Sequence, residues 1–125
     1  MCASLSRSPR VTVVEDDLSL LNALAFALEA EGFDVTALEH GRRLLTQPPE
    51  IDCLVVDLRL GDADGLTLVE DLRAVGCSPP AILITTNPDQ RCRRRAAQAG
   101  IEIVEKPLIG PELVASVCAA LERAR

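Results

Sequence analysis

The sequence predicts a doubly wound α/β domain, in which helices cover both faces of a five-stranded parallel sheet. From Arg10 onward, short β-branched runs alternate with longer segments of helical periodicity. Gly or Pro stands at nearly every junction between these segments. The central runs LVVD and AILIT are apolar almost throughout, which is typical of strands buried on both faces. At 125 residues, the chain has the length of one domain with its own core.

The elements follow one another as successive βα units. Strands are expected over residues 11–15, 33–38, 53–57, 81–85 and 101–105, and helices over 18–31, 42–46, 66–75, 91–99 and from 111 onward. The last helix is expected to have Gly110 as its N-cap and Pro111 at its first position. Its inner face is expected to contain Val114, Val117, Cys118 and Leu121. Residues 1–9 are expected to form a flexible tail, and residues 10–125 the folded domain.

Composition excludes several classes of function. Thirteen Lys and Arg against nineteen Asp and Glu give a formal net charge of -6, which disfavours direct binding to nucleic acid or to an anionic membrane. Aromatic residues make up 2% of the chain, so a base-stacking surface is not expected. No stretch approaches the length of a membrane span.

The five cysteines do not form a C-x-x-C pair, and the single histidine, His40, has no cysteine at metal-ligand spacing. A zinc site is therefore not expected. The odd number of cysteines, and the apolar runs around Cys53 and Cys118, favour buried or free thiols in a reducing compartment. This predicts a cytoplasmic location.

Carboxylates are predicted to meet at one edge of the sheet. In the flavodoxin-like strand order 2-1-3-4-5, ligands bind at the carboxyl ends of the first and third strands. Glu15 and Asp16 end the first predicted strand, and Asp57 ends the third. Such a cluster needs a cation, and oxygen ligands without imidazole or thiolate favour Mg²⁺ (or Mn²⁺). Asp17, the next residue, is expected to cap the first helix instead.

The other strand ends carry groups that suit a phosphoryl ligand. Thr85 supplies a hydroxyl after the fourth predicted strand, and Lys106 supplies a positive charge after the fifth. Mg²⁺ commonly binds protein carboxylates together with phosphate oxygens. The site is therefore expected to bind a phosphoryl group.

The motifs VVEDD, LVVDLRLGDADG, AILITT and VEKP stand in this order at the ends of four predicted strands. With them, the chain resembles the receiver domain of bacterial two-component response regulators over residues 11–123. The resemblance implies that Asp57 accepts a phosphoryl group from a histidine kinase or a histidine phosphotransfer protein. It implies Asp16 as a direct metal ligand, Glu15 as a ligand through water and the backbone carbonyl of Arg59 as a third. Thr85 and Lys106 would hold the phosphoryl oxygens.

Four positions depart from the family pattern. Gly61 stands near a position that usually carries Pro, and Thr86 stands where a small residue is usual. A more mobile loop and narrower access to the site are the expected consequences. Ile103 replaces the family's switch aromatic, and because an aliphatic side chain cannot copy the inward rotation of a ring, the usual coupling to output is not expected. Ile109 replaces a polar residue before the last helix.

Two surfaces are candidates for binding partners. An apolar strip formed by Leu20, Ala23, Phe26 and Ile109 is predicted to dock the kinase or phosphotransfer protein, although scattered exposed apolar groups explain it equally well. Three arginines of the fourth predicted helix, Arg91, Arg94 and Arg95, are predicted to contact an acidic target or a second copy of the chain. A solvated helix face is the alternative for these arginines.

The leading hypothesis is a signalling phosphoacceptor, which would be a stand-alone receiver if the protein ends at Arg125. A fragment of a longer regulator and a pseudo-receiver that binds proteins without phosphorylation are kept as alternatives. A haloacid-dehalogenase-type phosphatase is disfavoured because Arg59 stands where its acid/base Asp is needed. A flavodoxin is disfavoured because the carboxylates after the first strand would repel the cofactor's phosphate. The chain is therefore not expected to be an enzyme.

Overall fold

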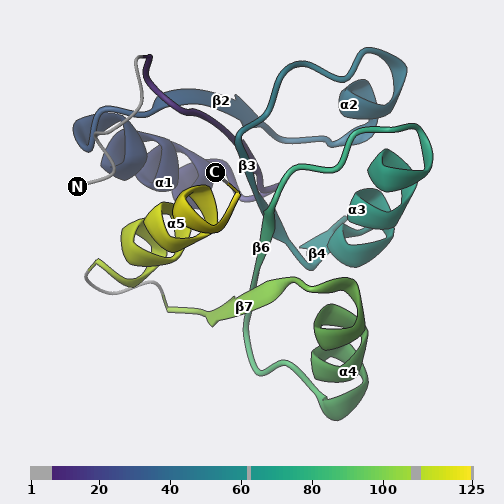
Figure 1. Ribbon diagram of the computed structural model, residues 1–125. Coiled ribbons are helices and arrows are strands. Elements are labelled where there is room, and N and C mark those ends of the chain that lie inside the picture. The colour runs from purple at the N-terminus through teal and green to yellow at the C-terminus, as the bar shows by residue number, and fades with distance from the viewer. Residues whose placement is uncertain (1–6, 62, 108–110, 125) are drawn as a thin grey trace.

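The computed structural model describes residues 7–61, 63–107 and 111–124. It contains a five-stranded parallel sheet in the order β2-β1-β3-β6-β7, which confirms the predicted order 2-1-3-4-5 (Figure 1). The strands are β1 (Arg10–Val14), β2 (Asp34–Leu38), β3 (Cys53–Asp57), β6 (Ala81–Thr85) and β7 (Glu102–Glu105). The helices are α1 (Leu18–Ala30), α2 (Arg42–Thr46), α3 (Gly65–Ala74), α4 (Gln90–Ala99) and α5 (Glu112–Arg123).

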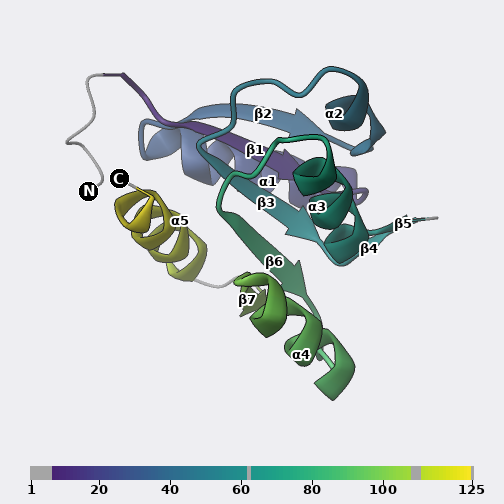
Figure 2. The same ribbon diagram turned by 45° about the vertical axis from the view of Figure 1, so that its right-hand side comes forward.

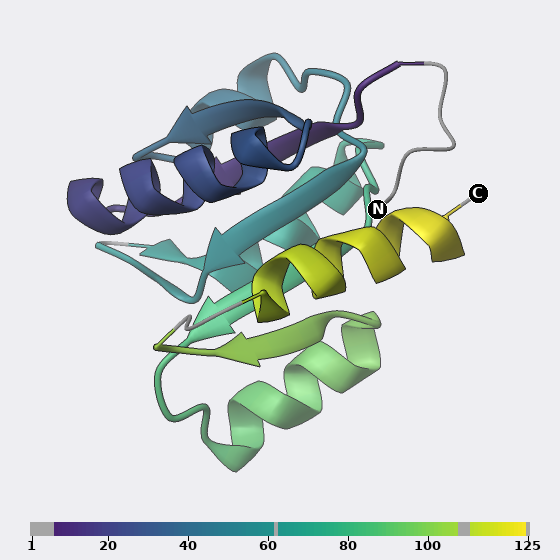
Figure 3. The same cartoon turned by 90° about the vertical axis from the view of Figure 1, so that its left-hand side faces the viewer.

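Two apolar layers flank the sheet. Helices α1 and α5 lie on one face (Figure 3), and α2, α3 and α4 on the other (Figure 2). Successive side chains of β3 alternate between the layers: Val55 packs with α1 and α5, whereas Leu54 and Val56 pack on the opposite side. Every residue of β3 and β6 is buried, as predicted for central strands.

A two-stranded antiparallel ladder that the sequence did not predict follows β3 directly. It consists of β4 (Arg59–Leu60) and β5 (Ala63–Asp64) (Figure 2). Within it, Arg59 pairs with Asp64. The ladder was missed because two-residue strands are too short to carry a periodicity. The ladder begins two residues after Asp57, the predicted phosphoacceptor.

Aspartates cap three of the helices at their N-termini. Asp17 accepts a hydrogen bond from the Leu20 N–H and caps α1, as predicted, and Asp64 and Asp89 cap α3 and α4. The prediction for the last helix needs correction, because Pro111 occupies the N-cap position and the first helical residue is Glu112. The predicted cap Gly110 lies outside the described residues.

The inner face of α5 also differs from the prediction. Leu113, Val117, Ala120 and Leu121 are its buried residues. Val114 and Cys118 are only partly buried and pack against the edge of the same core. The apolar stripe is thus rotated slightly from the predicted one, because α5 lies over β3, β6 and β7 and the sheet sets which positions face inward.

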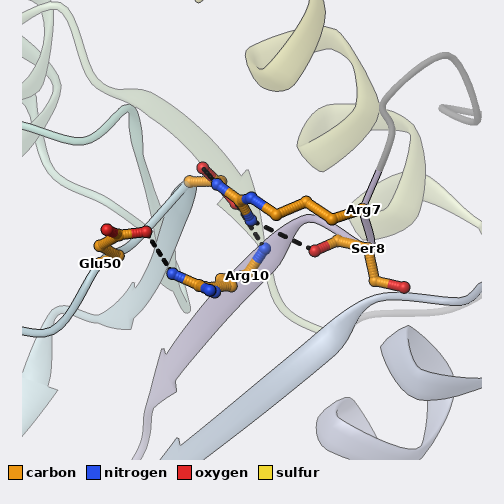
Figure 4. Close-up of polar contacts among 5 residues, drawn as sticks. Arg7, Ser8, Arg10 and Glu50 are labelled. Atoms are coloured by element: carbon orange, nitrogen blue, oxygen red, sulfur yellow. Dashed lines mark hydrogen bonds and ion pairs between the residues drawn. The ribbon is translucent and has the colours of Figure 1, made fainter.

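Ion pairs fix the start of β1 at the end of the sheet opposite the carboxylates. Arg7 donates two hydrogen bonds to Asp52, at 2.9 and 3.2 Å, and the Arg10 N–H donates to Asp52 at 2.7 Å. The Arg10 side chain binds Glu50 (Figure 4). Arg7 and its neighbour Ser8, which the sequence assigns to the tail, therefore lie against the folded domain.

Three cysteines, Cys53, Cys77 and Cys92, are free thiols. Cys118 is disulfide-bonded, which corrects the expectation of a thiol at that position. A disulfide counts against the predicted reducing compartment, whereas the three free thiols agree with it. Among the described residues, no helix has both the length and the apolar character needed to cross a membrane.

Candidate functional site

The sheet brings three carboxylates together at its carboxyl edge. Glu15 directly follows β1 and Asp57 ends β3, and these strands are paired neighbours, with Val14 opposite Val56. One carboxylate oxygen from each of Glu15, Asp16 and Asp57 lies within 4.8 Å of the others. Glu15 and Asp57 are buried, whereas Asp16 is exposed. The strand-end argument from the sequence therefore placed all three correctly.

Lys106 reaches into this cluster from β7. Its Nζ lies 2.9 Å from Asp57 Oδ2 and 3.1 Å from Glu15 Oε1. Its backbone N–H donates to the Thr85 carbonyl at 2.8 Å, which fixes the residue beside the end of β6. The Lys106–Pro107 peptide bond is cis. One ammonium group therefore bridges two buried carboxylates contributed by different strands.

Burial and neighbouring charges shift the pKa values of Glu15 and Lys106. Burial, the largest cause, and the contact with Asp57 together raise the pKa of Glu15 from 4.5 to about 7, although the Asp17 N–H and Lys106 oppose the change. Burial alone would lower the pKa of Lys106, but its hydrogen bonds to Asp57 and Glu15 outweigh that effect and raise it. Lys106 is therefore a permanent positive charge in the site at neutral pH.

The turn after Asp57 is closely packed. The Arg59 N–H donates to Asp57 Oδ1 at 3.3 Å, and the Gly65 N–H donates to the Leu58 carbonyl at 2.8 Å. A Cβ at Gly65 would lie 2.2 Å from the Asp57 carbonyl oxygen, closer than any real contact. Only glycine allows α3 to begin so near the backbone of the candidate phosphoacceptor.

Thr85 and Ile103 lie on neighbouring strands. Thr85 is buried at the end of β6, and Ile103 is half-buried and packs against the core beneath α2, α3 and α4. Thr86 is exposed. Gly61 adopts a positive φ of 65°, a conformation that suits glycine and excludes the usual Pro.

The predicted partner surfaces are only partly exposed. On α1, Phe26 is 74% exposed and Ala23 is exposed, whereas Leu20 packs against the core. Ile109 lies outside the described residues. On α4, Arg91 and Arg94 are exposed.

Arg95 lies apart from those two arginines, because its guanidinium binds Asp64 at 3.1 Å and Glu70 at 3.5 Å. The sequence interpretation missed Asp64 altogether. An Asp one residue before a helix is a typical N-cap signal that could have identified it as the cap of α3. Nothing in the sequence pattern pairs it with Arg95.

The donor chemistry of the cluster fits a hard divalent cation. The converging ligand atoms are all carboxylate oxygens, which suit Mg²⁺ or Mn²⁺ better than zinc or copper. A single lysine contacts two of the three carboxylates. Glu15, Asp16 and Asp57 are therefore the residues that would hold such an ion.

Comparisons with known proteins agree on one family. Residues 11–118 match the family described as the response regulator receiver domain. The chain is 36% identical over 118 residues to nodulation protein W of Bradyrhizobium diazoefficiens, covering 92% of this chain and 52% of that protein. It is 36% identical over 124 residues to the phosphate regulon transcriptional regulatory protein PhoB of Rhizobium meliloti, covering 94% and 54%. The chain thus spans about half the length of these curated relatives.

Solved structures agree with the sequence match. The FixJ-N crystal structure superposes with a TM-score of 0.82 at 28% identity, covering 93% of this chain and 95% of that one. The beryllofluoride-activated DrrB receiver domain superposes with a TM-score of 0.81 at 25% identity, covering 93% and 99%. Together with the carboxylate cluster and its bridging lysine, the matched residues show that this chain belongs to the response regulator receiver domain family.

Proposed function

We propose that Asp57 accepts a phosphoryl group from a phosphohistidine of a sensor kinase or a phosphotransfer protein, and that the modification switches protein–protein contacts of the domain. Receiver domains are signalling modules that interact with kinases or phosphotransfer proteins and with downstream targets. The observation that carries the proposal is the position of Lys106, whose Nζ lies 2.9 Å from the Asp57 carboxylate within the acidic cluster.

The transfer needs few groups besides the nucleophile. Asp57 Oδ2 forms the new bond to phosphorus while the bond from phosphorus to the donor's imidazole nitrogen breaks. The departing imidazole keeps that electron pair and takes a proton from solvent. Lys106 stabilises the charge on the transferring oxygens, and the Arg59 N–H orients Asp57 through Oδ1.

Glu15, Asp16 and Asp57 would hold Mg²⁺ (or Mn²⁺), with the Arg59 carbonyl as a further ligand by the resemblance. The bound ion would neutralise negative charge on the phosphoryl oxygens. Thr85, at the end of β6, is proposed to donate its hydroxyl to a phosphoryl oxygen. The buried position of Thr85 beside the Lys106 backbone supports that role.

The remaining functional expectations are proposals of the same kind. The exposed part of the α1 strip, Ala23 and Phe26, is proposed to dock the phosphodonor protein. Arg91 and Arg94 are proposed to contact an acidic target or a second copy of the chain. A cytoplasmic location is also proposed, because it fits a domain that receives its phosphoryl group from a kinase. Ile103, in place of an aromatic switch residue, favours a pseudo-receiver as the second candidate function.

Phosphorylation by a small donor tests the proposal directly. The protein is incubated with phosphoramidate and Mg²⁺, and its intact mass is measured after quenching in acid. One base-labile phosphoryl group is expected on the wild type and on Asp71→Asn, an exposed carboxylate of α3 that serves as the matched control. No adduct is expected on Asp57→Asn, or on the wild type in EDTA. A wild-type protein that gains no phosphoryl group with Mg²⁺ or Mn²⁺ present overturns the proposal and supports the pseudo-receiver.

A further inference from the structure

Helix α4 is attached to the sheet by little apolar surface. Within α4, only Cys92 and Ala96 are buried, and Ala99 packs partly against the same core. These side chains are small, so the free energy gained by burying them is small as well. Polar contacts therefore have a large share in fixing the position of α4.

One of these contacts points toward the Asp57 turn. Arg95 NH1 lies 3.1 Å from Asp64 Oδ2, and Arg95 NH2 lies 3.5 Å from Glu70 Oε1. The Arg95 side chain is 31% exposed. Arg93, on the same helix, binds Glu105 of β7, and its side chain is 53% exposed. The Arg95–Asp64 contact is thus more sheltered from solvent and salt than the Arg93–Glu105 contact.

Asp64 joins α4, α3 and the turn that follows Asp57. Its Oδ1 accepts hydrogen bonds from the Leu66 and Thr67 N–H groups and caps α3, while its Oδ2 binds Arg95. Its backbone pairs with Arg59 in the β4–β5 ladder. A displacement of Asp64 therefore changes the position of Arg59.

The turn has no room to absorb such a displacement. Gly65, the residue after Asp64, lies so close to the Asp57 carbonyl that a methyl group would not fit between them. On the other side of the turn, the Arg59 N–H contacts Asp57 Oδ1 at 3.3 Å. The position of Asp64 is thereby transmitted both to the backbone of Asp57 and to its carboxylate.

We propose that Arg95 is a positioning residue for phosphorylation: through Asp64 it holds the Asp57–Arg59 turn and links the position of α4 to the state of the site. The inference rests on the proposed function of Asp57. Since coupling between two sites is reciprocal, phosphorylation of Asp57 changes the hold of Asp64 on Arg95 and loosens or tightens α4. Arg95 thus acts within the domain through its contact with Asp64, whereas the exposed Arg91 and Arg94 are available to bind a partner.

Two measurements on Arg95→Gln test the link, with Arg94→Gln as the control that removes the same charge from an exposed position of the same helix. In ¹H–¹⁵N NMR spectra of the unphosphorylated protein, Arg95→Gln is expected to move the Arg59 amide signal, and Arg94→Gln to leave it in place. With phosphoramidate as the donor, the rate constant for phosphorylation is expected to fall about threefold to tenfold in Arg95→Gln alone. Arg95→Lys, which keeps the charge, is expected to recover much of the loss.

The two readouts separate failure of the link from failure of the function. If Arg95→Gln matches Arg94→Gln in both the Arg59 signal and the rate, the link is overturned while the proposed function stands. If the wild type takes up no phosphoryl group, the proposed function fails, and the NMR comparison still tests the link. If Arg95→Gln does not fold, Arg95→Lys is compared with Arg94→Lys, and equal Arg59 signals and rates in those two overturn the link.

Discussion

The ammonium of Lys106 lies 2.9 Å from one oxygen of Asp57, while the second oxygen of Asp57 accepts the Arg59 N–H at 3.3 Å. The same ammonium also donates a hydrogen bond to Glu15 Oε1 at 3.1 Å. The Asp57 carboxylate is therefore oriented at both oxygens by groups from different parts of the chain, and Lys106 offsets the repulsion between two buried carboxylates.

Replacement of Lys106 by Met is expected to impair both folding and phosphorylation. The variant leaves Glu15 and Asp57 without their cation, so the free energy of unfolding at pH 7.5 should fall by about 1–3 kcal/mol. The phosphorylation rate should fall at least about tenfold, because the transferring oxygens lose a positive charge. Urea titration and intact-mass kinetics measure the two effects. Arg91→Met, which removes an exposed cation, serves as control, and the prediction is wrong if the two variants behave alike.

Stability without metal is expected to fall as the pH rises from about 5 to 8. The pKa of Glu15 is raised from 4.5 to about 7 in the folded state, so the folded protein binds more protons than the unfolded chain between these values. The resulting stabilisation is complete below about pH 4.5 and is lost as the pH rises through 7, with a total of at most about 3 kcal/mol.

Urea unfolding in EDTA at several pH values measures this dependence. Glu15→Gln cannot titrate, so its profile should be flatter than that of the wild type. Identical slopes for the two proteins between pH 5 and 8 would contradict the assignment of the dependence to Glu15.

Gly65→Ala is expected to destabilise the domain by about 3 kcal/mol or more. The new methyl group would meet the Asp57 carbonyl oxygen at 2.2 Å, so α3 or the Asp57 turn must move. Gly76→Ala is the matched control: its φ is +89°, but no atom lies within 4 Å of the added methyl, so about 1 kcal/mol is expected. Equal losses in urea titrations would mean that the close approach at Gly65 is unimportant.

Phe26→Asp is expected to affect only transfer from a protein donor. The side chain is 74% exposed, so its replacement should change the free energy of unfolding by less than about 0.5 kcal/mol. Phosphorylation by phosphoramidate should be unchanged, while transfer from the cognate kinase should slow about tenfold or more because a docking contact is lost. Asn22→Asp, an exposed position on the same helix, adds the same charge as a control. An unchanged rate of transfer from the kinase to Phe26→Asp would remove Phe26 from the docking surface.

The sequence by itself determined the order of the five sheet strands and the edge at which the site lies. Residues 53–57 and 81–85 were predicted with the bounds that the structure has, because apolar runs of this length between turn residues have few alternatives to a buried strand. Once the strands are parallel, their carboxyl ends share one edge, and Glu15, Asp16, Asp57 and Lys106 must meet there.

Only the tertiary structure decided how the site is supported. The β4–β5 ladder is too short to leave a periodic pattern, and Arg95 and Asp64 are 31 positions apart in the sequence. The sequence of the arginine run does not indicate which carboxylate each arginine binds. The choice between solvent, a partner and Asp64 depends on where α4 lies, and that position results from the packing of Cys92 and Ala96 together with the polar contacts of the helix.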